Sequence, residues 1–153
     1  MNLQELLPEA IAWAKTQAQH VANHGHALSA PGLELAHQVG VKNPELVRLL
    51  YVDQLPIPVE PPRLRQAALD TGMLRPDMVG LTLGHSIFIV HGHDDARLIS
   101  HELRHVRQYE TLGGIEGFMP IYLAQMGGVG YELAPLEQDA RAHEVRGPRN
   151  QWT

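Results

Sequence analysis

The sequence predicts an α+β domain with a short mixed sheet, and three observations lead to this prediction. Residues 79–83 and 86–90 are apolar runs separated by the dipeptide Gly84-His85, which is the pattern of a tight β-hairpin. A third aliphatic run, residues 48–52, is typical of a buried strand. The segments around these runs repeat their apolar residues with the period of a helix.

Length and composition narrow the classes of protein to which the chain can belong. Its 153 residues suffice for one hydrophobic core but not for two. The formal net charge is −5 and no run of lysine or arginine occurs, so we expect no nucleic-acid partner, since that needs a basic face. No stretch approaches the roughly 20 apolar residues that span a bilayer, so we expect no membrane partner. The N-terminus lacks the basic region of a secretory signal, and cysteine is absent, so we expect a cytoplasmic protein without disulfides.

The first part of the chain, residues 1–45, is predicted to be helical. Residues 3–21 carry an apolar stripe at helical spacing, and Pro8 suggests that the helix proper begins near it. Residues 31–39 form a second, shorter helix that Gly40 ends.

His20 and His24 lie four residues apart near the end of the first predicted helix, and this spacing would suit a metal. No acidic residue stands between them. Imidazoles near a helix C-terminus complement the helix dipole, so we favour that interpretation over a metal site.

The middle of the chain supplies the strands. The strand at residues 48–52 follows Pro44-Glu45, which could instead begin a helix. A proline-rich connection then leads to a helix at residues 62–70, with Pro62 in its first turn. The predicted hairpin comes next, and its second strand runs directly toward the following helix.

That following helix, residues 95–112, carries the sharpest functional pattern in the sequence. Asp94 or Asp95 can cap its start, and Gly113-Gly114 supplies the left-handed backbone that would end it. At 100° per residue, its arginines fall opposite its apolar residues. The helix is therefore amphipathic, with one buried face.

His101, Glu102 and His105 form an H-E-x-x-H pattern on that helix. Two imidazoles four residues apart project from one helical face and can bind one Zn²⁺, and the glutamate between them can accept a proton from water at the metal. Because the chain has 10 histidines, an accidental match has a chance of roughly one in twenty. The rest of the sequence must therefore support the site.

Two helices are predicted after the motif. Residues 118–126 are apolar enough to pack against the core, and residues 135–146 begin with Pro135 and end before Gly147-Pro148. We expect residues 147–153 to be a mobile tail.

A zinc ion that does chemistry normally takes three protein ligands and leaves one position for water. Thr111 stands where a third histidine would follow the motif, and Glu110 and Glu116 lie too near the motif helix to fold back easily. Glu137 begins a separate helix that could pack alongside. A first-turn glutamate can equally serve the helix dipole, so local reasoning leaves Glu137 open.

Two segments together resemble the gluzincin class of zinc metallopeptidases, in particular its small bacterial members. His101-Glu102-Leu103-x-His105-x-x-Gln108-Tyr109 is similar to the active helix of that class, and Ala134-Pro135-Leu136-Glu137-Gln138-Asp139-Ala140-Arg141 is similar to the segment that supplies its third ligand. The resemblance covers residues 46–146, which it implies to be a metallopeptidase-like core within a single zincin-like domain of residues 1–146. It implies that His101, His105 and Glu137 bind zinc, that Glu102 is the general base, and that the substrate is a peptide or protein.

The resemblance also leaves specific roles open. Many gluzincins carry an aspartate where this chain has Arg141, so orienting a ligand histidine falls to Asp139, Glu144 or a backbone carbonyl. Tyr131 is the candidate that stabilises the oxyanion, although a half-buried aromatic lid over the last helix is an alternative role; the other candidate donors are His91, His93 and Arg141.

Residues 87–90 resemble the edge strand that holds an extended peptide substrate antiparallel in that class. Two rival interpretations remain. One is a module that binds zinc without turnover, and the other is a helical interaction domain in which H-E-x-x-H is accidental.

Overall fold

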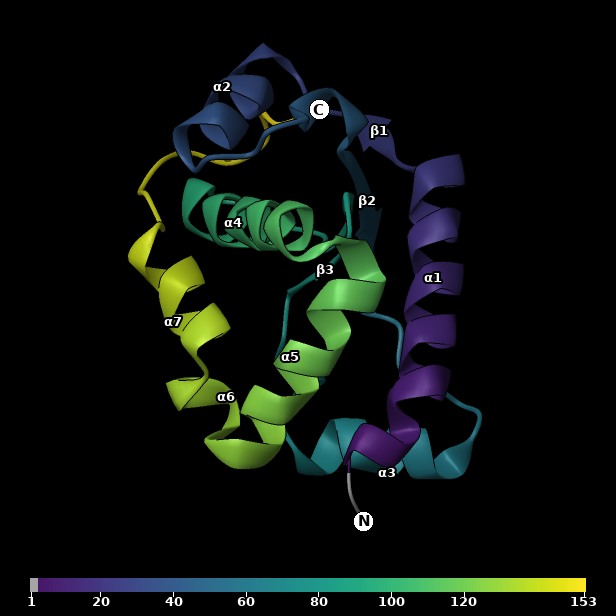
Figure 1. Cartoon of the computed structure of the whole chain (residues 1–153). Coiled ribbons are helices and arrows are strands. Elements are labelled where there is room, and N and C mark those ends of the chain that lie inside the picture. Colours follow the sequence, from purple (N-terminus) through teal and green to yellow (C-terminus); the bar gives the residue numbers. More distant parts are fainter. Residues whose placement is uncertain (1–2) are drawn as a thin grey trace.

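A four-stranded mixed sheet lies at the centre of the fold, with helices on both faces (Figure 1). The computed structural model describes residues 3–153. Its elements, in chain order, are η1 Leu3–Leu6, α1 Leu7–His24, β1 His26–Ala27, α2 Ala30–Gln38, η2 Pro44–Leu46, β2 Arg48–Val52, α3 Pro62–Asp70, β3 Gly80–Leu83, β4 Ser86–Val90, α4 Ala96–Leu112, α5 Gly114–Gly128, α6 Gly130–Leu133 and α7 Pro135–Ala142. The predicted α+β class is confirmed.

The strands lie in the order β1-β2-β4-β3. β1 pairs antiparallel with β2, β2 pairs parallel with β4, and β3 and β4 form the antiparallel hairpin expected from the sequence. The prediction that Ile87–Val90 lies at the edge is wrong, because the parallel pairing with β2 makes β4 an internal strand. β3, the hairpin partner of β4, is an edge strand instead, and β1 lies at the opposite edge.

Residues of β4 alternate between the two faces of the sheet. Ile87 and Ile89 pack with Ile99 and Leu103 of α4, in a core cluster that also contains residues of α2. Phe88 points the other way, where it packs with residues of α1. The sheet is therefore covered by α4 and α2 on one face and by α1 on the other. Because β1 and α1 belong to residues 3–45, this part of the chain is built into the same unit as the rest.

The motif helix α4 forms where the sequence predicts it. The Asp95 side chain accepts a hydrogen bond of 2.9 Å from the backbone N–H of Leu98, which caps the helix start. Gly113 ends the helix with a positive φ of 92°, a conformation that favours glycine.

Two helices near the C-terminus differ from their predicted bounds. α5 begins at Gly114 and not at residue 118, since the helix restarts directly after the break at Gly113. α7 ends at Ala142 and not at residue 146. The chain turns away there, and the N–H of Val145 donates to Ser100 Oγ of α4 at 3.0 Å.

The structure also differs from the expectation of a mobile tail at residues 147–153. Trp152 is only 3% exposed, and its indole N–H donates to the carbonyl oxygen of Asp94 at 2.7 Å. The backbone N–H of Ser29 donates to the carbonyl oxygen of Trp152 at 2.8 Å. The tail therefore ties the start of α4 to the start of α2. An aromatic side chain that reaches a buried site holds the end of the chain in place, which local sequence rules do not anticipate.

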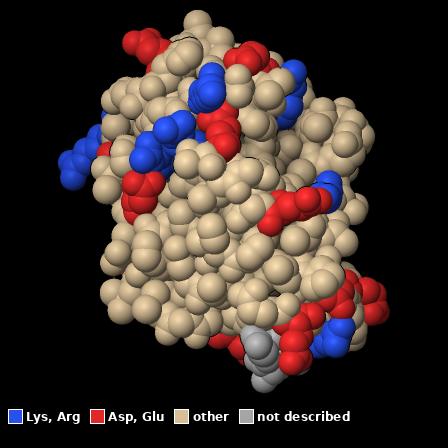
Figure 2. Space-filling view, viewed as in Figure 1, with Lys and Arg blue, Asp and Glu red and all other residues tan. Residues whose placement is uncertain are grey.

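The surface carries charge of both signs. On the face viewed in Figure 2, acidic and basic side chains lie close to one another, and the broad area between the charged groups shows neither sign. Within residues 3–153, none of the helices combines the length and apolar character that crossing a bilayer requires.

Replacing Trp152 with alanine should lower the free energy of unfolding by about 3–5 kcal/mol, because it empties a buried aromatic site and removes a hydrogen bond. Urea denaturation followed by circular dichroism measures this. Arg146→Ala, an exposed change in the same segment, should stay within about 0.5 kcal/mol. Equal and small effects of the two changes would contradict the docking of the tail.

Candidate metal centre

α4 presents His101 and His105 on its buried face. The two residues are one helical turn apart, and their ring centroids lie 4.9 Å from each other in an edge-to-face arrangement. The exposed fractions are 7% for His101 and 5% for His105. Such a pair of buried imidazoles needs polar partners, because burying polar groups without hydrogen bonds is costly.

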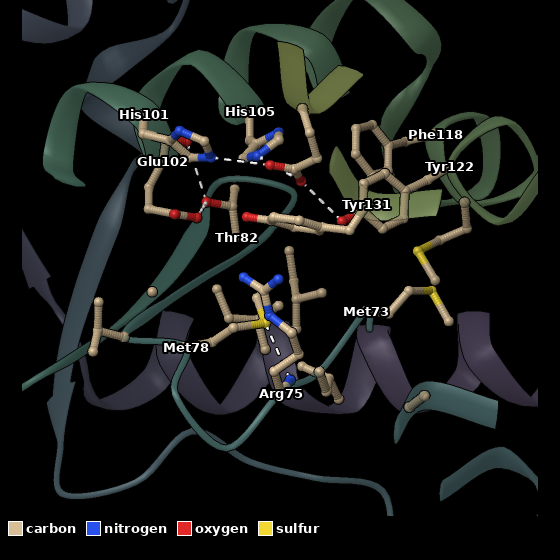
Figure 3. Close-up of a pocket in the computed structure, with 18 of the residues that line it drawn as sticks. Met73, Arg75, Met78, Thr82, His101, Glu102, His105, Phe118, Tyr122 and Tyr131 are labelled. Carbon is tan, nitrogen blue, oxygen red and sulfur yellow. Dashed lines mark hydrogen bonds and ion pairs between the residues drawn. The ribbon is translucent and has the colours of Figure 1, made fainter. Parts of the chain in front are cut away.

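Glu137 supplies the facing carboxylate. It lies in the first turn of α7, which packs against α4, and it is 3% exposed. Its Oε1 lies 3.1 Å from His101 Nε2, and its Oε2 lies 3.1 Å from His105 Nε2. Figure 3 shows His101 and His105 side by side above a cavity, and Glu137 lines the same cavity. The structure thus brings together the three residues that the resemblance implies as ligands.

The three side chains form a group that could hold a metal ion. One ligand atom from each lies within 4.8 Å of the others. In a tetrahedral site with bonds of about 2.0–2.1 Å, ligand atoms are separated by roughly 3.3 Å, which is close to the observed 3.1 Å. Two imidazole nitrogens and one carboxylate are ligands that suit zinc and neighbouring transition metals.

The electrostatics of the group also favour a cation. Burial alone would lower the pKa of His105, but the Glu137 carboxylate, with help from Glu102, raises it to about 9. The pKa of His101 is raised for similar reasons, against the effect of its burial. Burial would raise the pKa of Glu137, but the two histidines hold it well below its ordinary value. Positive charge is therefore stabilised at the point where the three side chains meet.

A second layer of contacts orients the two imidazoles. His101 Nδ1 lies 2.7 Å from Glu144 Oε2, and His105 Nδ1 lies 2.7 Å from Gln108 Oε1. Because Nδ1 of each ring contacts one of these side chains, Nε2 of each ring is left to face Glu137. Metal-binding histidines likewise use their second ring nitrogen in a contact that fixes the orientation of the ring. Of the candidates for orienting a ligand histidine, Glu144 acts directly on His101.

Asp139 acts on His105 indirectly, through Gln108. The Gln108 side-chain N–H₂ donates to Asp139 Oδ2 at 2.8 Å, and Arg104 Nε donates to the same oxygen at 2.8 Å. Asp139 therefore fixes the amide of Gln108, which in turn orients His105. Arg141, the departure from the gluzincin pattern, lies outside this chain of contacts and donates to the backbone oxygen of Glu132.

Tyr122 belongs to the site, although the sequence analysis missed it. Its hydroxyl donates to Glu137 Oε2 at 2.8 Å. Its ring stacks on Phe118 with centroids 5.2 Å apart, and burial together with the nearby Glu137 carboxylate raises its pKa well above the ordinary value. The available signal was the Phe118–Tyr122 pair, two aromatic residues four apart on one face of the predicted helix.

His101, His105 and Glu137 are called the metal group from here on. Glu102 lies beside this group and is held in place by the edge strand β3. Thr82 Oγ1 of β3 donates to Glu102 Oε1 at 2.7 Å. A Cβ atom at Gly80 would lie 2.9 Å from Glu102 Oε2, so glycine makes room for the carboxylate. Glu102 is thus fixed between α4 and β3 without being part of the three-ligand group.

The metal group opens into a cavity of about 340 Å³. Glu102, Tyr131 and Arg141 also line it, whereas His91 and His93 are exposed and are not among its lining residues. Much of the remaining wall is apolar, with contributions from Trp13, Met73, Met78, Leu81 and Met119. Tyr131 is half-buried, and burial together with the Glu137 carboxylate raises its pKa.

Comparison of the chain with family models, with curated proteins and with solved structures finds no match. The gluzincin resemblance is thus carried by the two sequence segments alone. The function proposed below is based on the geometry of the described residues.

We predict that one metal ion binds per chain, held by His101, His105 and Glu137. Alanine at any of these three positions should reduce the metal content to the background level, because two remaining ligands make a weak site. His20→Ala and His24→Ala should leave the content unchanged, since that exposed pair lacks a carboxylate at its centre. Elemental analysis of protein purified without a histidine tag measures the content. Metal that survives all three site changes would contradict the assignment.

Glu144→Ala should weaken metal affinity by roughly 10- to 100-fold while keeping the one-to-one stoichiometry, because it removes the acceptor that orients His101. Competition with a chromogenic chelator measures the affinity. Glu34→Ala, at an exposed position on α2, serves as the matched control. An unchanged affinity in Glu144→Ala would show that this contact does not orient the ligand.

Proposed function

We propose that the protein is a zinc-dependent hydrolase of peptide bonds. One observation carries the proposal: the His101, His105 and Glu137 group opens into the same cavity that Glu102 lines. Structural zinc sites are normally closed by four protein ligands, whereas catalytic sites keep one position open. Among residues 3–153, two histidines and one glutamate converge here as candidate ligands. The side of this group that no protein ligand covers faces a cavity large enough for a substrate group.

The metal would supply Lewis acidity, which polarises a substrate carbonyl and brings the pKa of a water molecule to about 7. Glu102 is the residue that accepts the proton of the attacking water and passes it to the nitrogen of the leaving amine. A carbon–oxygen bond forms while the carbon–nitrogen bond breaks. The hydrogen bond from Thr82 keeps the Glu102 carboxylate in place for both transfers.

The other residues position the substrate and the metal ligands. Tyr122 donates a hydrogen bond to Glu137, which keeps that carboxylate aimed at the metal position. Tyr131 lines the cavity beside the group, where its hydroxyl is the candidate donor to the carbonyl oxygen as negative charge develops there. β3 lines the same cavity and lies at the end of the sheet, so an extended peptide would pair with β3, not with β4.

The rival interpretation, a zinc-binding module without turnover, rested on Arg141. Glu144 now orients His101 and Asp139 acts through Gln108, so the second layer of the site is complete without an aspartate at position 141. This supports a site that can turn over. A direct assay still has to separate the two functions.

Glu102→Gln should lower the cleavage rate of a mixed peptide library by about 10²- to 10⁴-fold at unchanged zinc content, because a general base acts only in the transition state. Glu137→Ala should lose both zinc and cleavage. Mass spectrometry of the products and elemental analysis of the same samples provide the two readouts.

Glu34→Gln is the matched control and should change neither quantity. Zinc-loaded protein that cleaves no member of the library would favour the binding module. Cleavage that persists in Glu102→Gln would refute the mechanism.

A further inference from the structure

Arg75 faces the metal group across the cavity. It lies in the connection between α3 and β3, and it lines the same cavity as the three ligands. Figure 3 shows its guanidinium pointing toward the ring of Tyr131, which lies next to the metal group. No role in the proposed hydrolysis uses this charge.

Local contacts hold Arg75 in place. Its backbone N–H points to Met78 Sδ at 3.3 Å, and the N–H of Met78 donates to the carbonyl oxygen of Arg75 at 3.1 Å, which closes a tight turn. The guanidinium carbon lies 4.2 Å from the centroid of the Tyr131 ring, within the range of a cation–π interaction. The side chain is therefore directed into the cavity before any ligand binds.

The ion pairs of the Arg75 guanidinium are long, and one of its N–H groups has no hydrogen-bond partner among the described residues. Its nearest carboxylates belong to Asp77, at 3.5 Å from Nε, and Glu132, at 3.9 Å from Nη1, and both are about 80% exposed, at 79% and 78%. Exposed pairs at such separations contribute little. Although the Arg75 side chain is 36% exposed, its Nε is shielded from solvent. Within residues 3–153 this nitrogen has the ion pair with Asp77 but no hydrogen bond. Buried N–H groups in folded proteins normally have a hydrogen-bond acceptor. The Arg75 Nε–H is therefore a donor that a bound ligand can satisfy.

The surroundings suit a carboxylate. A planar guanidinium offers paired N–H groups that match the two oxygens of a carboxylate. Arg141 adds a second positive charge near the same ring, with its guanidinium carbon 5.7 Å from the Tyr131 ring centroid. Four carboxylates also line the wall, and each lies near a donor of its own. Glu144 lies 3.6 Å from Arg97, and Glu132 lies 3.9 Å from Arg75. Glu102 accepts a hydrogen bond from Thr82, and Glu137 lies between the two histidines. Apolar walls strengthen a charge-assisted hydrogen bond, because they exclude water.

We propose that Arg75 is a specificity-determining residue that binds a carboxylate of the substrate. The carboxylate comes either from the C-terminus of a peptide or from an aspartate or glutamate side chain, and both present the same group to Arg75. The Tyr131 ring, over which the Arg75 guanidinium lies, lines the same cavity as the three candidate ligands. The peptide thus carries its negative charge close to the bond that is cleaved. Cleavage of such a peptide rests on the proposed function, whereas its binding does not.

The test measures binding separately from cleavage. Zinc-loaded Glu102→Gln protein is titrated by calorimetry with acetylated hexapeptides in matched pairs, which differ only in a C-terminal carboxylate or amide, or in glutamate or glutamine at one position. We expect one kind of carboxylate peptide to bind roughly 10- to 100-fold more tightly than its neutral partner, as expected for a hydrogen bond to a charged group. The pair that shows the difference identifies the source of the carboxylate.

Adding Arg75→Gln should erase the difference, and Arg75→Lys should restore part of it, because lysine keeps the charge without the paired donors. Arg65→Gln is the matched control, an equal loss of charge at an exposed position on α3 outside the cavity wall, and should keep the full difference. Zinc content and circular dichroism establish that each variant is folded.

Equal binding of carboxylate and neutral peptides by the folded parent protein would overturn the proposal, as would a difference that survives Arg75→Gln. Neither result would depend on whether any peptide is cleaved. Conversely, carboxylate-selective binding without cleavage by the protein that retains Glu102 would refute the proposed hydrolysis and leave the carboxylate site standing. The two failures are therefore distinguishable.

Discussion

The packing of α7 against α4 buries a carboxylate between two histidines, and the rest of the site depends on this arrangement. Removing charged groups from water costs several kcal/mol per ion unless each is paired and hydrogen-bonded. Glu137 meets that requirement through His101, His105 and Tyr122. A divalent cation at the same point would be held by the same carboxylate and would help to offset the cost of burying it.

The fold supplies fixed supports for this cluster. The β3–β4 hairpin brings Thr82 against Glu102, and the parallel pairing of β2 with β4 places that hairpin beside α4. Trp152 holds the start of α4 in place through its hydrogen bond to the carbonyl oxygen of Asp94. The candidate metal ligands and the candidate base therefore lie on elements that other parts of the fold hold in place, which preorganises the site.

Local patterns predicted the parts of the site that depend on spacing within one element. The H-E-x-x-H pair follows from helical geometry, and α4 begins and ends at the residues whose chemistry suits a cap. Glu137 needed the resemblance of a second segment, because a first-turn glutamate is ambiguous by itself. Contacts between distant segments could not be predicted: Tyr122 reaches Glu137 only through helix packing, Glu144 reaches His101 only because α7 ends early, and β4 becomes internal only through its pairing with β2.

The central claim is that a single metal ion binds at the meeting point of α4 and α7, with one side open to the cavity. Crystals of the zinc-loaded protein, measured at wavelengths on both sides of the zinc absorption edge, test this most directly. We expect one anomalous peak within about 2.0–2.2 Å of His101 Nε2, His105 Nε2 and a Glu137 carboxylate oxygen, with its remaining coordination position toward the cavity. A peak elsewhere, or a fourth protein ligand that closes the site, would contradict the account.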